Sequence, residues 1–145
     1  MRVVLDTNVL VSGMFWPGGP PRKIIQAWLA GGFSPLVSSE IVEEYTTVVK
    51  RISQKRGLDV SRLLERLLMR VDFVLPSPLP KQICSDTGDD KFIAAALSGR
   101  ANFIVTGDRA LLSVRQFRKV KVMTANAFAR MVERTPTTRP KNSLL

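Results

Sequence analysis

The chain has 145 residues, of which 45% are hydrophobic, and it carries 22 Lys and Arg against 12 Asp and Glu, for a formal net charge of +10. Its length fits one domain with a sizeable core, and its single cysteine and lack of histidine exclude an intramolecular disulfide and imidazole-based catalysis. No apolar run is long enough for a signal peptide or a membrane span, so we expect a cytoplasmic protein. The positive charge favours a polyanionic partner, with nucleic acid first.

The first half of the chain alternates apolar runs with Gly- and Pro-rich breaks. Val3–Leu5 is a continuous apolar run, typical of a buried parallel strand. The predicted elements that follow are a loop at 14–21, a helix at 22–30, a strand at 36–38, a helix with apolar residues from 41 to 52 that Gly57 ends, and a helix that Asp59 caps.

The second half continues the same alternation after a proline-rich linker. It predicts a strand at 73–75, a helix at 90–98, a strand at 103–105, a helical turn at 111–112, a strand at 120–123 and a helix from Thr124 to Arg134. Strands that alternate with helices predict an α/β domain over residues 1–134, with a parallel sheet and helices on both faces. Residues 135–145 read as a flexible basic tail.

Four acidic residues stand where such a fold would bring them together, namely Asp6, Glu44, Asp90 and Asp108. Asp6 and Asp108 directly follow predicted strands, and ligands of parallel sheets gather at the carboxyl ends of strands. Clustered carboxylates repel one another and need cations. Without histidine ligands, a hard cation such as Mg²⁺ or Mn²⁺ fits best, which indicates phosphoryl chemistry.

Each of these carboxylates also has an ordinary structural interpretation. Asp6 is able to organise the turn after its strand, with Asn8 capping the next helix or positioning Asp6 by a hydrogen bond. Asp108 is able to cap the turn that follows it, and Thr106 is placed to bond a carboxylate or a metal-bound water. Glu44 lies at the border of its helix's apolar stripe, which favours it over Glu40 and over the surface residue Glu43.

Asp90 belongs to a segment with several acidic residues. Thr87-x-x-Asp90 resembles a capping box, yet Asp90 shares a helical register with Ile93, Ala94 and Leu97, which predicts an inward position. Asp89 is then the capping or accessory residue, and Asp86 is an outer ligand or a turn former. The ordinary interpretations do not explain why four carboxylates converge, so we favour a shared site.

Four segments of the chain, in their order and spacing, resemble the PIN domain family from Met1 to about Met131. They are Asp6-Thr7-Asn8-Val9-Leu10, the helix with Glu44, Asp90-Lys91-Phe92-Ile93-Ala94-Ala95 and Val105-Thr106-Gly107-Asp108. The chain is most similar to PIN proteins regarded as toxins of toxin–antitoxin systems, related to VapC. One departure is Ser85-Asp86-Thr87-Gly88, where close relatives have Arg-Asp-Pro, so Asp86 is left out of the core site.

The resemblance implies a Rossmann-like three-layer fold, metal-dependent RNA cleavage, frequent homodimers and inhibition by a cognate antitoxin. Carried over by position, the catalytic and metal-binding residues are Asp6, Glu44, Asp90 and Asp108, supported by Asn8 and Thr106. The cofactor would be Mg²⁺, with Mn²⁺ as an alternative. One or two such ions would activate a water molecule and stabilise the leaving oxygen.

Basic side chains are candidates for an RNA track. Arg62, Arg66 and Arg70 recur at four-residue spacing on one helix, although a solvated basic face is an equal interpretation. Further candidates are Arg22, Lys23, Lys50, Arg51, Lys55 and Arg56. Trp16 would stack on a base, pack in a dimer contact or be buried locally, and the sequence does not choose.

Two other functions compete with a nuclease. A haloacid-dehalogenase-type phosphatase needs a second Asp two residues after the first, and this chain has Asn8 there. A non-catalytic basic domain that binds RNA or an antitoxin is the stronger alternative, and retention of all four carboxylates argues against it.

Overall fold

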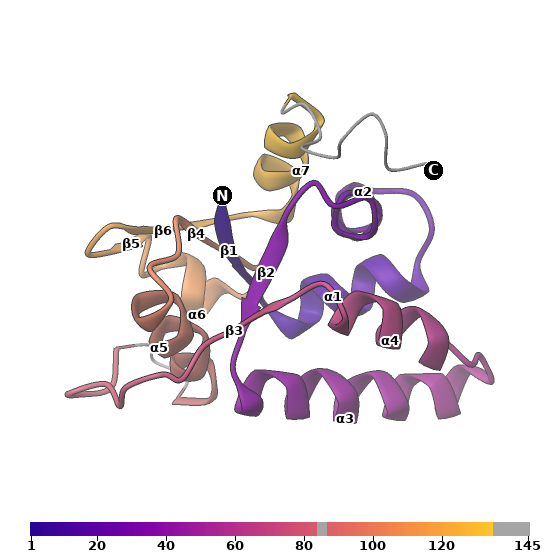
Figure 1. Ribbon diagram of the computed structural model, residues 1–145, viewed down its shortest axis with the longest axis horizontal. Helices are drawn as coiled ribbons and strands as arrows, with labels where there is room; N and C mark the ends of the chain where they lie inside the picture. The colour runs from indigo at the N-terminus through magenta and orange to yellow at the C-terminus, as the bar shows by residue number, and fades with distance from the viewer. Residues whose placement is uncertain (84–86, 135–145) are drawn as a thin grey trace.

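Arg2–Leu5 form the central strand β1, and Val3, Val4 and Leu5 are fully buried. The computed structural model describes residues 1–83 and 87–134, in which the sheet has the strand order β3-β2-β1-β4-β6-β5 (Figure 1). The other strands are β2 (Ser34–Val37), β3 (Asp72–Phe73), β4 (Phe103–Val105), β5 (Gln116–Phe117) and β6 (Val120–Met123). All neighbours run parallel except β5 and β6. The predicted α/β class with a mainly parallel sheet is confirmed.

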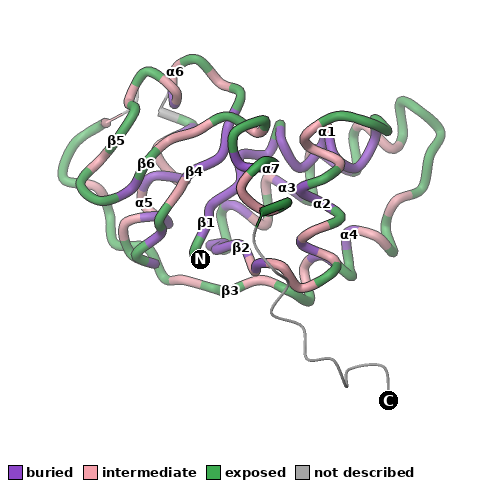
Figure 2. Tube along the Cα trace, turned by 90° about the horizontal axis from the view of Figure 1, so that it is seen from above, coloured by how far each residue is buried: buried purple, intermediate pink, exposed green. Residues whose placement is uncertain are grey.

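Helices cover both faces of this sheet. They are α1 (Thr7–Phe15), α2 (Pro20–Leu29), α3 (Ser39–Arg56), α4 (Ser61–Leu68), α5 (Asp90–Ser98), α6 (Arg109–Leu112) and α7 (Ala125–Arg134), with a 3₁₀ turn at Thr87–Asp89. Helix α5 packs against β1, β2 and β4, whereas α2 packs against α1 and α7 on the other side. Figure 2 shows the buried residues following β1 and β4 through the middle of the molecule.

Several helix ends are where the sequence predicts them. The Ser38 hydroxyl accepts a hydrogen bond from the Ile41 N–H at 3.3 Å and begins α3. Gly57 has a φ of +63° and ends the same helix, because the left-handed region favours glycine. Thr124 accepts from the Ala127 N–H at 3.2 Å and begins α7. Asp59 bonds the Ser61 N–H at 2.9 Å, one residue before the position that a cap would take.

Helix α1 is absent from the sequence prediction, which has no element at 7–13 and begins a loop at Met14. Its residues are buried on almost every side, so they show no amphipathic period. Gly13 explains the close packing, because a Cβ there would lie 2.4 Å from Ile25 Cγ1 and 2.5 Å from the Pro21 carbonyl oxygen.

The two edges of the sheet also differ from the prediction. Strand β3 ends at Phe73 rather than at residue 75, and Leu75 is 93% exposed. Strand β5 was not predicted, because Gln116-Phe117 is too short to show a period and its turn to β6 contains Arg118-Lys119 rather than Asn-Gly. The predicted tail at 135–145 and the residue Asp86 lie outside the described residues. No helix in the described ranges is both long and apolar enough to cross a membrane.

Candidate metal centre

Asp6 lies at the carboxyl end of β1 and is only 4% exposed. Its backbone N–H donates to the Val105 carbonyl oxygen at 2.9 Å, which ties the end of β1 to the end of β4. Parallel pairing of these two strands therefore places Asp6 beside Thr106 and Asp108, which follow β4. The predicted convergence at this edge is present in the fold.

The Thr106 hydroxyl links two of the candidate acids. Its Oγ1 donates to Asp6 Oδ2 at 2.6 Å and accepts from the backbone N–H of Asp108 at 2.9 Å. Thr106 is fully buried, so this bridge is not shared with solvent. Asp108 Oδ1 in turn caps α6 by accepting from the Ala110 N–H at 2.8 Å. Asp108 therefore makes the predicted capping bond, and its carboxylate also repels that of Asp6.

Glu44 reaches the same edge from α3. Its Oε2 accepts a hydrogen bond from the Thr7 hydroxyl at the start of α1, and its Oε1 lies 2.7 Å from Lys91 Nζ on α5. This polar contact joins three helices beside Asp6. Glu43 and Glu40 are exposed, and Glu40 lines a cavity with Asp90, whereas Glu44 is the residue of its segment whose charge acts on Asp6.

Tyr45 fixes the register of α3 against the sheet. Its hydroxyl donates to the Leu5 carbonyl oxygen at 2.5 Å, and the side chain is fully buried. Burial and the nearby carboxylates of Asp6 and Glu44 raise the pKa of Tyr45 above its usual range. Tyr45 therefore stays a neutral donor that holds Glu44 close to the end of β1.

The carboxylates at this edge of the sheet repel one another. Burial raises the pKa of the Asp6 carboxyl group above its usual value, and the carboxylates of Asp108 and Glu44 raise it further. Hydrogen bonds from the Thr106 hydroxyl and the Asn8 backbone N–H act in the opposite direction. Asn8 thus assists through its main chain, while its side chain is exposed. A buried acid with a raised pKa beside two other acids indicates a functional site.

Helix α5 buries residues on the faces below both Asp89 and Asp90. Asp89 is 8% exposed, and Phe92, Ile93 and Ala96, three, four and seven residues further on, are buried. Ala94 and Leu97, in the register of Asp90, are only partly buried. Ile93, which shares the predicted register of Asp90, is fully buried, so the Ala-rich helix does not separate the faces of Asp89 and Asp90, and the assignment of Asp90 to the site stays a prediction.

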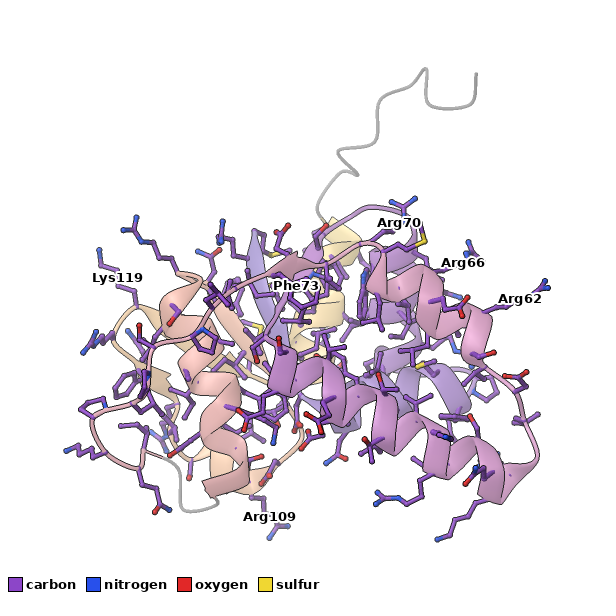
Figure 3. The ribbon with its side chains drawn as sticks, turned by 60° about the horizontal axis from the view of Figure 1, so that its bottom comes forward. Arg62, Arg66, Arg70, Phe73, Arg109 and Lys119 are labelled. Carbon is purple, nitrogen blue, oxygen red and sulfur yellow. The ribbon has the colours of Figure 1, made fainter. Side chains whose placement is uncertain are left out.

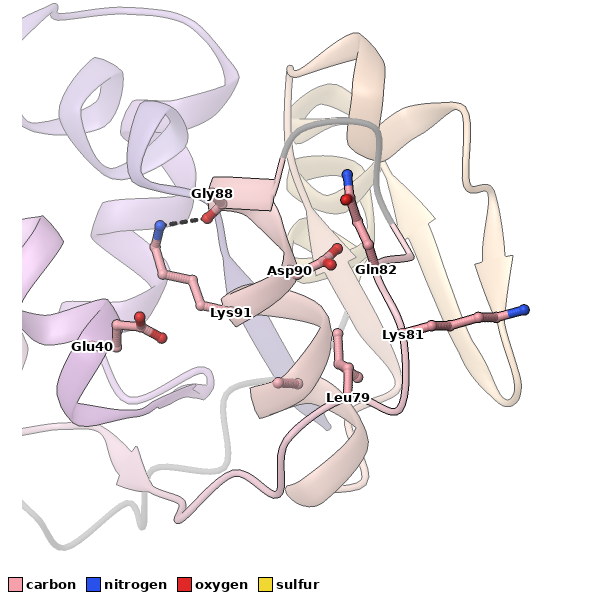
Figure 4. Close-up of a pocket in the computed structure, with 8 residues that line it drawn as sticks. Glu40, Leu79, Lys81, Gln82, Gly88, Asp90 and Lys91 are labelled. Atoms are coloured by element: carbon pink, nitrogen blue, oxygen red, sulfur yellow. Dashed lines mark hydrogen bonds between the residues drawn. The ribbon is translucent and has the colours of Figure 1, made fainter.

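Asp90 faces a neighbouring cavity of about 420 Å³. Its Oδ2 accepts from the Ile83 N–H at 3.1 Å, and it lines this cavity together with Leu79, Gln82 and Lys91. In Figure 4, Asp90 points toward Gln82, whereas Lys91 points toward α3. Asp89, which the sequence indicates as a capping or accessory residue, is more buried than Asp90 and is therefore also a candidate metal ligand.

The acidic side chains at this edge offer oxygen donors for a metal ion. Within residues 1–83 and 87–134, no three acidic side chains form a ready coordination cage. The oxygen donors of Asp6, Asp108 and Glu44 nevertheless suit Mg²⁺ or Mn²⁺, and their mutual repulsion is relieved by a cation. Lys91, which the sequence reasoning missed, already supplies one positive charge to Glu44. In the sequence, the place of Lys91 directly after Asp89 and Asp90 is the feature that could have indicated this role.

The basic side chains lie in separate places. The Arg70 carbonyl oxygen accepts from Trp28 Nε1 at 2.9 Å, and Arg70 lies two residues before β3, at the amino edge of the sheet. Figure 3 shows Arg62 and Arg66 on α4 and Arg70 just beyond its end, with Arg109 at the lower edge of the view. At the far end of α3, the Arg56 guanidinium lies 4.7 Å from the ring centroid of the half-exposed Trp16.

The chain is similar to known proteins at the level of its family. The chain is similar to an uncharacterized protein, MJ1680, of Methanocaldococcus jannaschii, with 29% identity over 123 residues that cover 82% of this chain and 78% of the relative. No solved structure matches the chain. The family model described as PIN domain matches residues 2–110, which include Asp6, Glu44 and Asp108. The chain therefore belongs to the PIN domain family, whose members are generally nucleases.

Proposed function

We propose that this protein is a metal-dependent endoribonuclease that hydrolyses phosphodiester bonds. The observation that supports it best is the buried Asp6, which meets the charges of Asp108 and Glu44 at the carboxyl edge of the sheet. PIN domains typically bind divalent metals, and this arrangement of oxygen donors fits that property. The absence of histidine from the sequence is compatible with such chemistry, because it needs no protein nucleophile.

In this proposal each side chain has a distinct task. Asp6, Asp108 and Glu44 would hold the metal, with Asp89 or Asp90 as the fourth acid. The bound metal would lower the pKa of a water molecule and stabilise the leaving oxygen. Thr106 holds the Asp6 carboxylate in one orientation. Lys91 holds Glu44 and reduces the repulsion between Glu44 and Asp6 while metal is absent.

The substrate class follows from charge and family resemblance. A net charge of +10 attracts a nucleic-acid backbone. Resemblance to VapC-like proteins favours RNA as the substrate and a role as the toxin of a toxin–antitoxin system. A cognate antitoxin and a homodimer are parts of the same proposal. The alternative is a basic PIN domain that binds RNA or an antitoxin without cleaving RNA. Such a domain would use the positive charge and would need no metal.

A cleavage assay distinguishes these functions. Purified wild type is incubated with single-stranded RNA, and in parallel with single-stranded DNA, in Mg²⁺ and in excess chelator. We expect RNA cleavage in Mg²⁺, none in chelator, and full recovery when Mg²⁺ is restored. Asp6→Asn serves as the control for contaminating nucleases. RNA binding without cleavage under every condition would instead support the binding domain.

A further inference from the structure

A second cavity, of about 450 Å³, lies at the opposite edge of the sheet from the carboxylates. Ala101 and Asn102 precede β4 and Lys119 precedes β6, so the cavity opens beside the amino ends of these two strands. In Figure 3, Lys119 lies at the upper left, and Arg109, which adjoins Asp108, lies at the lower edge of the view. The cavity is therefore separate from the candidate metal centre.

The lining of this cavity combines an apolar floor with a positively charged rim. Leu97, Ala101 and Val120 supply aliphatic surface, and Arg100, Arg118 and Lys119 supply three cations. None of its described lining residues is acidic. In the described ranges, the ion pairs are Lys23–Glu133 and Lys91–Glu44, so the three rim cations have no carboxylate partner there. Their charge is available to an anion.

Both rim arginines adopt backbone conformations that favour glycine. Arg100 has a φ of +54° and follows Gly99 at the end of α5, where a left-handed residue is usually glycine. Gly99 is itself closely packed, because a Cβ there would lie 2.7 Å from Leu36 Cδ1 and would require that side chain to move. Arg118 has a φ of +53° in the two-residue turn between β5 and β6, a position that favours Asn or Gly. Arginine costs stability at both positions.

Two arginines that the backbone does not favour thus meet at one cavity. Strained residues that persist in a fold point to a functional constraint on their side chains. Guanidinium groups match phosphate oxygens with paired hydrogen bonds, and the apolar floor suits a planar or aliphatic body. A volume of about 450 Å³ is in the range of small-ligand pockets.

We propose that this cavity binds a nucleotide, with its phosphates held by Arg100, Arg118 and Lys119 and its nucleoside on the Leu97–Val120 floor. A smaller cavity of about 250 Å³ shares Leu97 and Arg118 and adds Pro78 and Ser98, which extends the same surface. The site is independent of the proposed nuclease function. Through this site the protein would bind a free nucleotide at the edge of the sheet opposite the carboxylates.

The test is calorimetric titration of the full chain with ATP, tripolyphosphate and adenosine in excess chelator, which removes metal from the other edge. We expect ATP to bind more tightly than either tripolyphosphate or adenosine. Arg100→Gly and Arg118→Gly should each weaken ATP binding about tenfold or more, because each loses a charge-assisted contact. Both variants should keep or raise the melting temperature, since glycine suits these conformations.

Arg115→Gly is the matched control. Arg115 also has a positive φ, +61°, but does not line the cavity, so its glycine variant should bind ATP like the wild type. Asp6→Asn should also leave ATP binding unchanged, because it lies at the other edge. No saturable ATP binding, equal affinity for tripolyphosphate, or equal weakening in Arg115→Gly would each overturn the proposal.

Discussion

The buried carboxyl group of Asp6 makes the stability of the metal-free protein depend on pH. Its pKa is raised in the folded state, so between the unfolded value, about 3.9, and the folded value the folded state binds more protons. The free energy of unfolding should therefore fall as pH rises through this window. Urea unfolding in chelator from pH 4 to pH 7.5 would measure the slope, and Asp6→Asn should remove the contribution of this group. An identical pH dependence in wild type and variant would contradict the raised pKa.

The two adjacent acids at the start of α5, Asp89 and Asp90, lead to different predictions about the site. Asp89 is buried on the face shared with Phe92 and Ile93, whereas Asp90 bonds the Ile83 N–H beside another cavity. We expect Asp89→Asn to lower Mg²⁺-dependent RNA cleavage by about 100-fold or more, as for Asp6→Asn and Asp108→Asn. Asp90→Asn should retain most activity. Strong loss of RNA cleavage in Asp90→Asn alone would instead support Asp90 as the fourth acid of the site, as the sequence periodicity predicts.

At the scale of the elements, Lys91 connects α5 to α3 through Glu44. The two groups are 13% and 31% exposed, so their ion pair is partly shielded from solvent. Lys91→Met should lower the free energy of unfolding in chelator by about 1 to 2 kcal/mol, because Glu44 then faces Asp6 without a cation. Mg²⁺ should recover more stability in this variant than in the wild type, since the metal replaces the missing charge.

Lys23→Met is the matched control for this prediction. Lys23 pairs with Glu133 at the same distance of 2.7 Å, but both side chains are at least half exposed. Exposed pairs contribute about 0 to 1 kcal/mol, so urea unfolding should show little change and no altered response to Mg²⁺. Equal destabilisation by the two variants would mean that the Lys91 pair has no special relation to the carboxylates.

The sequence predicted elements where one physical signal dominated. Apolar runs marked β1 and β4, and Ser38, Gly57 and Thr124 marked helix ends through local hydrogen bonds and backbone freedom. Helix α1 was missed because burial on all sides removes the amphipathic pattern. Asp6, Thr106 and Asp108 could be placed together because each follows a strand end. Lys91 and Asp89 could not, since their roles depend on the rotation of α5 about its own axis.

At the scale of the whole molecule, the sheet separates two kinds of surface. Its carboxyl edge gathers Asp6, Asp108 and Glu44, and its amino edge carries the cavity rimmed by Arg100 and Arg118. Mg²⁺ should therefore raise the melting temperature of the wild type, because binding to the folded state stabilises it. Because Asp6 is a proposed ligand in either case, the shift should disappear in both Asp6→Asn/Asp90→Asn and Asp6→Asn/Asp89→Asn, and the single variants Asp89→Asn and Asp90→Asn distinguish which acid is the fourth ligand. An undiminished shift in both double variants would place the ion elsewhere.

The net charge of the protein does not show which helix contacts the RNA backbone. Arg70 lies at the amino edge of the sheet, whereas α3 begins directly after the carboxyl end of β2 and carries Glu44. We therefore expect Lys50→Gln/Arg51→Gln/Lys55→Gln to weaken RNA binding and to flatten its log–log salt dependence by roughly 0.7 per lost phosphate contact. Arg62→Gln/Arg66→Gln/Arg70→Gln, which removes the same charge from α4 and the turn after it, is the matched comparison. Filter binding across a range of salt concentrations measures both slopes. A flatter slope in the α4 variant alone would return the RNA path to Arg62, Arg66 and Arg70, and would leave the carboxylate site as proposed.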